Sequence, residues 1–247
     1  MEILTDYVNL KVGDGTNMRA WTARPMARSA HPGLLVLQEA FGVNAHIRDV
    51  TQRFAREGFV AIAPELFHRT GPGFEGSYDA FPTVVPHLNA LKDDQMEADQ
   101  RAAFDWLTAQ GVAEGRIGAV GYCMGGRAAF LAGLTLPLGC ATSYYGGGIA
   151  PRGTNPGLLM RAKDLRCPVL LFWGGQDKHL TQDMVRAVRD TLSEAGKNFI
   201  NVEFSDADHG FFCDARASYN PTAAAEAWPL TLAFLRQHTA QAAVAAR

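Results

Sequence analysis

Cys123 stands in a segment whose composition favours nucleophilic chemistry. Residues 121–126 read GYCMGG, so glycines lie two positions before and two positions after Cys123. The segment follows a predicted strand and begins a predicted helix, as a nucleophile elbow does, here with cysteine in the place of serine. The helix N-terminus favours a thiolate, and the N–H of Met124 is one expected oxyanion donor. Taken alone, the segment also fits a tight turn around a buried cysteine.

Two further side chains complete a candidate triad. Asp177 follows a predicted strand in a glycine-rich loop, and His209 follows the next predicted strand. Taken singly, each also fits an ordinary turn or loop residue. The order nucleophile, acid, histidine is that of α/β-hydrolases, and all three residues come after strands, where ligand crevices of parallel sheets lie. We therefore predict a triad of Cys123, His209 and Asp177.

Other residue patterns point away from metal or nucleotide chemistry. His179 is interpreted as a loop residue. The remaining histidines lack a strand-end position or a fitting order; these are His31, His46, His68, His87 and His238. No His, Cys, Asp or Glu residues have metal-ligand spacing, so we expect no metal and no cofactor. Residues 118–121 do not match GxGxxG, and no GxxxxGK occurs, so nucleotide binding has no support.

The elements that must position these residues alternate along the chain. Residues 7–12 and 18–23 predict an antiparallel hairpin around a glycine turn. Predicted strands follow at residues 33–37, 59–63, 116–120, 139–145, 168–173 and 201–204. Predicted helices cover residues 45–57, a segment from 94, 124–135, 181–195, and a C-terminal segment after 222 in which Pro229 predicts a kink or restart. This alternation predicts an α/β fold with a mostly parallel sheet and helices on both faces.

Residues 64–92 interrupt the alternation. They show no clean period and contain several prolines and glycines. A loop of this length within a domain is usually functional or mobile, so the segment is a candidate lid or pocket loop, with a plain surface excursion as the alternative. No linker or internal repeat divides the chain. We therefore expect one domain over residues 1–247.

The composition bounds the partners and the compartment. The chain has 247 residues, 47% hydrophobic and 19% charged, which excludes a disordered protein. A net charge of −2 leaves no basic surplus for nucleic acid. The absence of a signal-peptide pattern at residues 1–6 and of an apolar run of about 18–20 residues predicts a cytoplasmic protein without a membrane segment. The cysteines lack paired spacing and are expected to be reduced; they are Cys123, Cys140, Cys167 and Cys213. A monomer is expected, with a homo-oligomer left open.

Several motifs together resemble one known family. The most specific are residues 38–44 (QEAFGVN), 121–126 (GYCMGG), 144–146 (YYG), 174–177 (GGQD) and 209–211 (HGF). From about residue 7 to residue 237 the chain resembles the dienelactone hydrolase family of α/β-hydrolases, which use a Cys-His-Asp triad. The resemblance implies the α/β-hydrolase fold and the cleavage of a small ester or lactone by acyl transfer to water.

The resemblance also implies roles for residues that the sequence alone does not single out. Glu39 matches a family glutamate that holds the nucleophile's thiol until substrate arrives; without the family, an exposed strand-end glutamate is the simpler interpretation. The N–H of Ala40 matches the second oxyanion donor. Tyr144 matches a position that lines the substrate pocket.

The sequence departs from the family where the substrate carboxylate is held. Dienelactone-cleaving members have an arginine four residues after the catalytic histidine, where this chain has Cys213. Residues 70–100 contain no arginine either. Arg69 and Arg216 are the candidates to replace these arginines. An unpaired carboxylate in a desolvated pocket costs at least roughly 2–3 kcal/mol, so another ester or lactone is the better expectation.

Two other classes of function stay open. A thioesterase, peptidase or general carboxylesterase could use the same fold and the same residues. A non-catalytic binder or a redox-responsive thiol protein could retain the scaffold, although the presence of all three triad residue types favours an enzyme.

Overall fold

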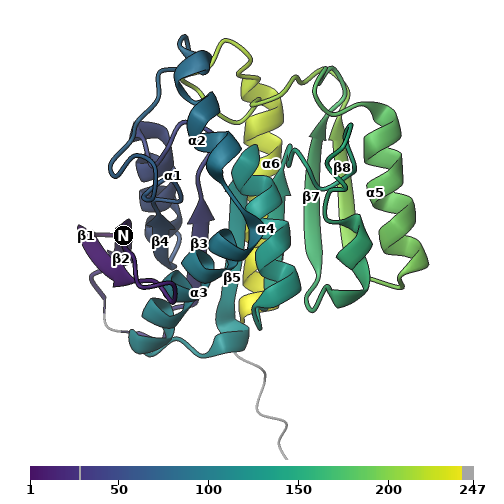
Figure 1. Cartoon of the computed structure of the whole chain (residues 1–247). Coiled ribbons are helices and arrows are strands. Elements are labelled where there is room, and N and C mark those ends of the chain that lie inside the picture. Colours follow the sequence, from purple (N-terminus) through teal and green to yellow (C-terminus); the bar gives the residue numbers. More distant parts are fainter. Residues whose placement is uncertain (28, 241–247) are drawn as a thin grey trace, which may run out of the picture.

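Eight strands form a single sheet in the computed structural model, which describes residues 1–27 and 29–240 (Figure 1). Their order across the sheet is β1-β2-β4-β3-β5-β6-β7-β8. The strands are β1 Ile3–Lys11, β2 Asn17–Pro25, β3 Gly33–Leu37, β4 Val60–Pro64, β5 Ile117–Tyr122, β6 Cys140–Tyr144, β7 Val169–Gly174 and β8 Phe199–Phe204. The β1–β2 and β2–β4 pairs are antiparallel, and every pair from β4 to β8 is parallel.

Helices cover both faces of this sheet. They are α1 Ala45–Arg56, α2 Val85–Ala90, α3 Asp93–Ala109, α4 Met124–Thr135, α5 Gln182–Glu194 and α6 Pro221–Thr239, with short 3-10 turns η1 Phe81–Thr83, η2 Glu114–Arg116 and η3 Leu159–Asp164. In Figure 1, α3 and α4 lie in front of the sheet and α6 lies behind it. Phe54 of α1 packs on Trp228 of α6 with ring centroids 4.6 Å apart, so these two helices share the far face. The expected α/β fold with an N-terminal hairpin is confirmed.

The central strands are buried along their whole length. Every residue of β3, β5, β6 and β7 is buried, whereas the edge strand β8 is only partly covered. Continuous apolar runs are what strands covered on both faces require. The predicted strands therefore have the right order, with ends that move by up to two residues, or by four at the start of the hairpin.

The first crossover helix follows its sequence signals closely. The side chain of Asn44 accepts a hydrogen bond from the N–H of Ile47 at 3.2 Å and caps α1. The buried face of α1 includes Ile47, Val50 and Phe54. Gly58 ends the turn at a φ of 99°, a conformation that favours glycine.

Two regions differ from the sequence expectation. The segment 64–92 is not structureless, because it contains η1 and α2. Helix α6 continues through Pro229 without the restart that the proline suggested. Proline removes one helical hydrogen bond, but residues on both sides of it, including Ala227 and Leu232, are buried, and this packing keeps the helix in place.

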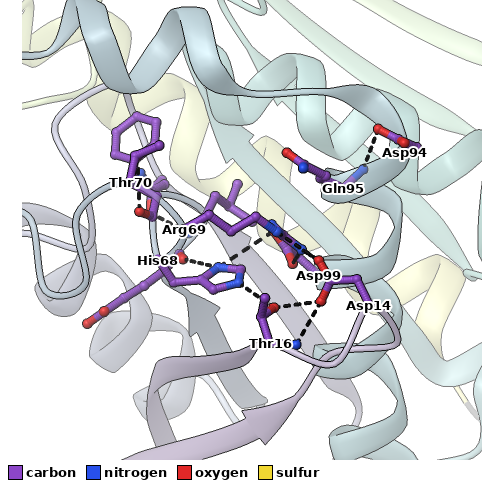
Figure 2. A network of polar contacts seen from close by, with 12 residues as sticks. Asp14, Thr16, His68, Arg69, Thr70, Asp94, Gln95 and Asp99 are labelled. Carbon is purple, nitrogen blue, oxygen red and sulfur yellow. Dashed lines mark hydrogen bonds and ion pairs between the residues drawn. The ribbon is translucent and has the colours of Figure 1, made fainter.

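An ion-pair network around the buried carboxylate of Asp99 fixes the beginning of the 64–92 segment (Figure 2). The guanidinium of Arg69 lies between Asp99 of α3, at 2.8 Å, and Asp14 of the β1–β2 turn, at 2.6 Å. His68 also contacts that turn, with Nε2 3.0 Å from the hydroxyl of Thr16. The side chain of Asp99 is fully buried, and burial raises the pKa of its carboxyl, while the pair with Arg69 acts in the opposite direction. Among the described residues, no helix is long and apolar enough to cross a bilayer.

Candidate active site

Cys123 occupies a strained turn between β5 and α4. Its φ is 56° and its ψ is −117°, outside the regions that non-glycine residues normally adopt. The flanking glycines make the turn possible: a Cβ on Gly121 would meet the carbonyl of Gly125, and a Cβ on Gly125 would meet the carbonyls of Leu37 and Gln38. Strain of this kind persists only where the surroundings impose it, and it is common at catalytic positions.

His209 and Asp177 meet above the ends of β7 and β8. Nδ1 of His209 lies 2.7 Å from Oδ2 of Asp177. The other carboxylate oxygen of Asp177 accepts the N–H groups of His179 and Leu180 at 2.7 and 3.1 Å. The two loops are tied together by backbone hydrogen bonds, including that from Gln176 N–H to the Ala207 carbonyl at 2.9 Å. The carboxylate is therefore held in one orientation toward the imidazole.

The charges around His209 favour its protonated form. Burial alone lowers the pKa of this imidazole, but a negative charge on Cys123 and the hydrogen bond to Asp177 raise it to about 10. Burial raises the pKa of Asp177, yet its bonds to His209 and to the two backbone N–H groups outweigh burial and lower it. The arrangement thus favours the imidazolium form of His209 beside the Asp177 carboxylate.

Glu39 is buried and paired with an arginine. It follows β3, and its side chain is fully buried. Its Oε1 atom accepts a hydrogen bond from Nη1 of Arg216 at 3.1 Å, whereas Oε2 has no hydrogen-bond partner among the described residues. The exposed position that the sequence alone favoured for Glu39 is wrong. Arg216 is thus engaged within the protein, and Arg69 is held in the network of Figure 2.

A cavity of about 590 Å³ contains the reactive groups. Cys123, His209 and Arg216 line it together with Ala40 and Met124. Five of its other lining side chains are apolar, namely Phe41, Phe81, Leu88, Leu180 and Met184, and five are polar or charged, namely Asn89, Arg127, Arg152, Asn155 and His179. A larger hollow of about 680 Å³ beside the hairpin contains none of the predicted site residues. The wall therefore offers a ligand both apolar contacts and polar or cationic groups.

The 64–92 segment supplies part of this wall. Phe81 of η1, Leu88 of α2 and Asn89 face the cavity. A hydrogen bond of 3.0 Å from Gly76 N–H to the Phe41 carbonyl ties the segment to the loop after β3. Phe41 also packs on Tyr78 with ring centroids 4.6 Å apart. The segment is therefore a pocket wall in this structure, and its motion as a lid stays a prediction.

Tyr144 does not line the cavity, contrary to the expectation from the family. Its side chain is fully buried, and its hydroxyl lies 2.6 Å from Oγ1 of Thr231 and 3.2 Å from the carbonyl of Ala227 in α6. Residue 144 is the last of β6, so its side chain packs under α6 on the far face. The next residue, Tyr145, instead contacts His209, with ring centroids 5.1 Å apart.

The sequence did not single out most of the wall. Phe81, Leu180 and Met184 belong to no motif, and nothing in their local pattern separates them from core residues. Tyr145, which contacts His209 but is not among the cavity-lining residues, stood inside the matched motif 144–146 without a role of its own.

Comparison with known proteins agrees with this architecture. Residues 18–239 match the profile of the "Dienelactone hydrolase family". The chain belongs to the dienelactone hydrolase family. The resemblance inferred from the motifs is thereby confirmed, and the chain is a hydrolase with the α/β-hydrolase fold of that family.

Relatives of this dienelactone hydrolase family member cover almost the whole chain. The "Putative carboxymethylenebutenolidase" of Synechocystis sp. is 39% identical over 237 residues, which is 92% of this chain and 94% of the relative. The "Carboxymethylenebutenolidase" of Pseudomonas sp. is 28% identical over 95% of this chain and 96% of its own. A solved structure titled "Putative Dienelactone Hydrolase" from Klebsiella pneumoniae has a TM-score of 0.88 at 33% identity, covering 96% of this chain and 100% of its own.

Proposed function

We propose that the protein hydrolyses a small carboxylic ester or lactone through a thioester formed on Cys123. The observation that carries this proposal is the 2.7 Å contact between His209 and Asp177, in a cavity that also exposes Cys123 on its strained turn. A cysteine at a helix N-terminus beside an oriented histidine is the arrangement that activates a thiolate.

The proposed reaction has two stages. The Cys123 thiolate attacks the ester carbonyl carbon, and the N–H groups of Ala40 and Met124 stabilise the resulting oxyanion. The carbon–oxygen bond to the alcohol then breaks, and His209 gives the leaving alkoxide its proton. In the second stage His209 takes a proton from water, the hydroxide attacks the thioester, and the thiolate leaves. Asp177 keeps the imidazole in the required tautomer throughout.

Glu39 is proposed to control the thiol before substrate arrives. In the family this glutamate holds the nucleophile's thiol, and here the Oε2 atom of Glu39 has no other hydrogen-bond partner among the described residues. The guanidinium of Arg216 donates a hydrogen bond to the other oxygen, Oε1, at 3.1 Å. Glu39 therefore keeps one carboxylate oxygen free to hold the thiol of Cys123.

The cavity favours an apolar acyl group over the carboxylate of dienelactone. Arg216 already neutralises Glu39, and Cys213 stands where dienelactone-cleaving members have an arginine. The cavity wall combines apolar side chains with Arg127, which is paired with Asp93 at 2.6 Å, and with Arg152. A substrate carboxylate would compete with Glu39 for Arg216 and with Asp93 for Arg127, so we propose that an uncharged ester or lactone is the better substrate. Turnover of the dienelactone would instead assign its carboxylate to Arg152.

A panel of substrates tests the proposal. Uncharged esters, lactones, thioesters and a dienelactone are offered to the wild-type protein, to Cys123→Ala and to Cys167→Ala, which removes a buried cysteine outside the cavity. We expect turnover by the wild type and by Cys167→Ala, and none by Cys123→Ala. Equal activity of Cys123→Ala would contradict the nucleophile. Stoichiometric alkylation of Cys123 without turnover on any substrate would favour a binding or redox protein instead.

A further inference from the structure

Three residues from distant parts of the chain meet behind the loop that follows β3. Glu39 is the second residue after β3, and His46 lies in the first turn of α1. Cys213 belongs to the β8–α6 connection. A carboxylate oxygen, a ring nitrogen and the Sγ atom of these residues all lie within 4.8 Å of one another, and all three residues are buried. Among residues 1–27 and 29–240, this is the one group of three such side chains so close together.

Two atoms of this cluster lack the partners that buried polar atoms normally have. Oε2 of Glu39 and Nε2 of His46 make no hydrogen bond within the described part of the chain. The side chain of Glu39 is fully buried, and that of His46 is 4% exposed. Leaving such atoms unpaired destabilises the folded state, so a ligand that binds both atoms would stabilise it.

On its other side, Glu39 has a hydrogen bond and His46 lies near a carboxylate without a hydrogen bond to it. Oε1 of Glu39 accepts a hydrogen bond from Arg216 at 3.1 Å, which leaves Oε2 as the oxygen that is free to bind a ligand. Nδ1 of His46 lies 3.6 Å from Oδ1 of the exposed Asp214, which leaves Nε2 free. A carboxylate beside the second ring nitrogen is the usual companion of a metal-ligating histidine.

We propose that Glu39, His46 and Cys213 form a binding site for a borderline divalent cation of the zinc type. Carboxylate oxygen, imidazole nitrogen and thiolate sulfur are the ligands that zinc accepts, and the thiolate disfavours magnesium and calcium. On binding, the thiol of Cys213 releases its proton to solvent and a metal–sulfur bond forms. The metal keeps its oxidation state, and water completes the coordination. The ion takes the Oε2 atom that the proposed function gives to the Cys123 thiol, so a bound ion and a thiol held by Glu39 exclude each other.

The cluster must tighten slightly to take the ion. Zinc bonds of about 2.0–2.3 Å at tetrahedral angles place ligand atoms roughly 3.5 Å apart. Cys213 has a partner to give up, because its Sγ now lies 3.2 Å from the hydroxyl of Tyr78. The sequence spacing gave no sign of this site, since the three residues lie far apart in the chain and only folding joins them.

Cobalt(II) is a suitable probe, because a cobalt–thiolate bond gives a charge-transfer absorption band. The titration uses Cys123→Ala protein, in which the proposed nucleophile cannot bind the ion. We expect one cobalt ion per chain, a thiolate-to-cobalt band, and displacement of the ion by zinc. No band at millimolar cobalt would overturn the site and leave buried water as the partner of the two atoms.

Second substitutions in the same background locate the ion. Cys213→Ser is expected to remove the band, and His46→Gln to weaken cobalt binding at least about 100-fold, while Asp214→Asn weakens it about tenfold. Cys167→Ser and His238→Gln are matched controls that keep the band and the affinity. Circular dichroism confirms that each variant is folded.

Unchanged binding in the ligand variants contradicts the proposal. Should Cys213→Ser fail to fold, the pair His46→Gln and Asp214→Asn decides, and wild-type affinity in both would reject the site. Because the readout is metal binding in a protein without Cys123, the result does not depend on the proposed hydrolysis.

Discussion

Nη1 of Arg216 lies 3.1 Å from Oε1 of Glu39, so the arginine close to His209 in the chain is paired inside the protein. The Glu39 side chain is fully buried and the Arg216 side chain is 20% exposed. This pair links the loop after β3 to the β8–α6 connection. It also joins the Glu39 carboxylate to Arg216, which lines the cavity that contains Cys123.

Removing Arg216 should destabilise the fold. Arg216→Gln leaves the Glu39 carboxylate buried without its cation, and we expect a loss of about 2–4 kcal/mol in the free energy of unfolding. Chemical denaturation measures this loss. The double variant Glu39→Gln/Arg216→Gln is the control, and it should recover most of the stability because no charge remains. A double variant as unstable as Arg216→Gln would argue against the ion pair.

The alkaline limit of activity should depend on Asp177. Because the pKa of His209 is raised to about 10, the imidazolium that accompanies the thiolate persists into the alkaline range. We expect kcat/KM for an uncharged ester to fall as the pH rises through that value. Asp177→Asn removes a charge and a hydrogen bond that favour imidazolium, so the fall should occur at lower pH.

The same Asp177 variant should also be slower at its optimum. A wrongly oriented tautomer costs roughly 10²–10⁴-fold in kcat. A pH–rate series on both proteins gives both quantities. An alkaline limb that stays at the same pH in Asp177→Asn would show that this carboxylate does not control His209.

The elbow should tolerate no side chain at residue 121. A Cβ on Gly121 would meet the Gly125 carbonyl, so Gly121→Ala must distort the strand-to-helix turn. We expect a loss of more than about 4 kcal/mol, or no folded protein. Gly115→Ala is the matched control, because nothing lies within 4 Å of its Cβ, and its effect should stay within about 0.5 kcal/mol. Thermal denaturation compares the two.

Phe81 should contribute to substrate binding rather than to chemistry. Its ring lines the cavity and is 49% exposed, so its truncation removes apolar contact with an acyl group. Phe81→Ala should raise KM about fivefold, equivalent to about 1 kcal/mol, with little change in kcat. Val85→Ala, an exposed residue of α2 outside the cavity lining, should leave KM unchanged. A large fall in kcat for Phe81→Ala would indicate a gating role instead.

Arg69 should matter for stability and not for turnover. Arg69→Met removes the cation beside the buried Asp99, and we expect a loss of about 3 kcal/mol. Because Arg69 lies outside the cavity lining, kcat/KM of the folded variant should equal that of the wild type. Denaturation and steady-state kinetics on one preparation test both halves. A selective loss of activity toward carboxylate-bearing substrates would restore Arg69 as a substrate-binding residue.

The sequence by itself determined the local elements and the order of the candidate catalytic residues. Residues 33–37 and 124–135 were predicted as a strand and a helix with the bounds that β3 and α4 have, because apolar runs and periodicity are local signals. Cys123, Asp177 and His209 were placed after strands, and parallel strands bring their carboxyl ends to one edge of the sheet.

Only the tertiary structure decided the partners of these residues. Glu39 and Arg216 are 177 positions apart, and no local pattern indicates that they meet. The burial of Tyr144 under α6, the cavity wall at Phe81 and the cluster around Cys213 likewise depend on how separate elements pack. Periodicity and capping act within a few residues, whereas a buried charge or a cavity wall is set by side chains that approach from distant parts of the chain.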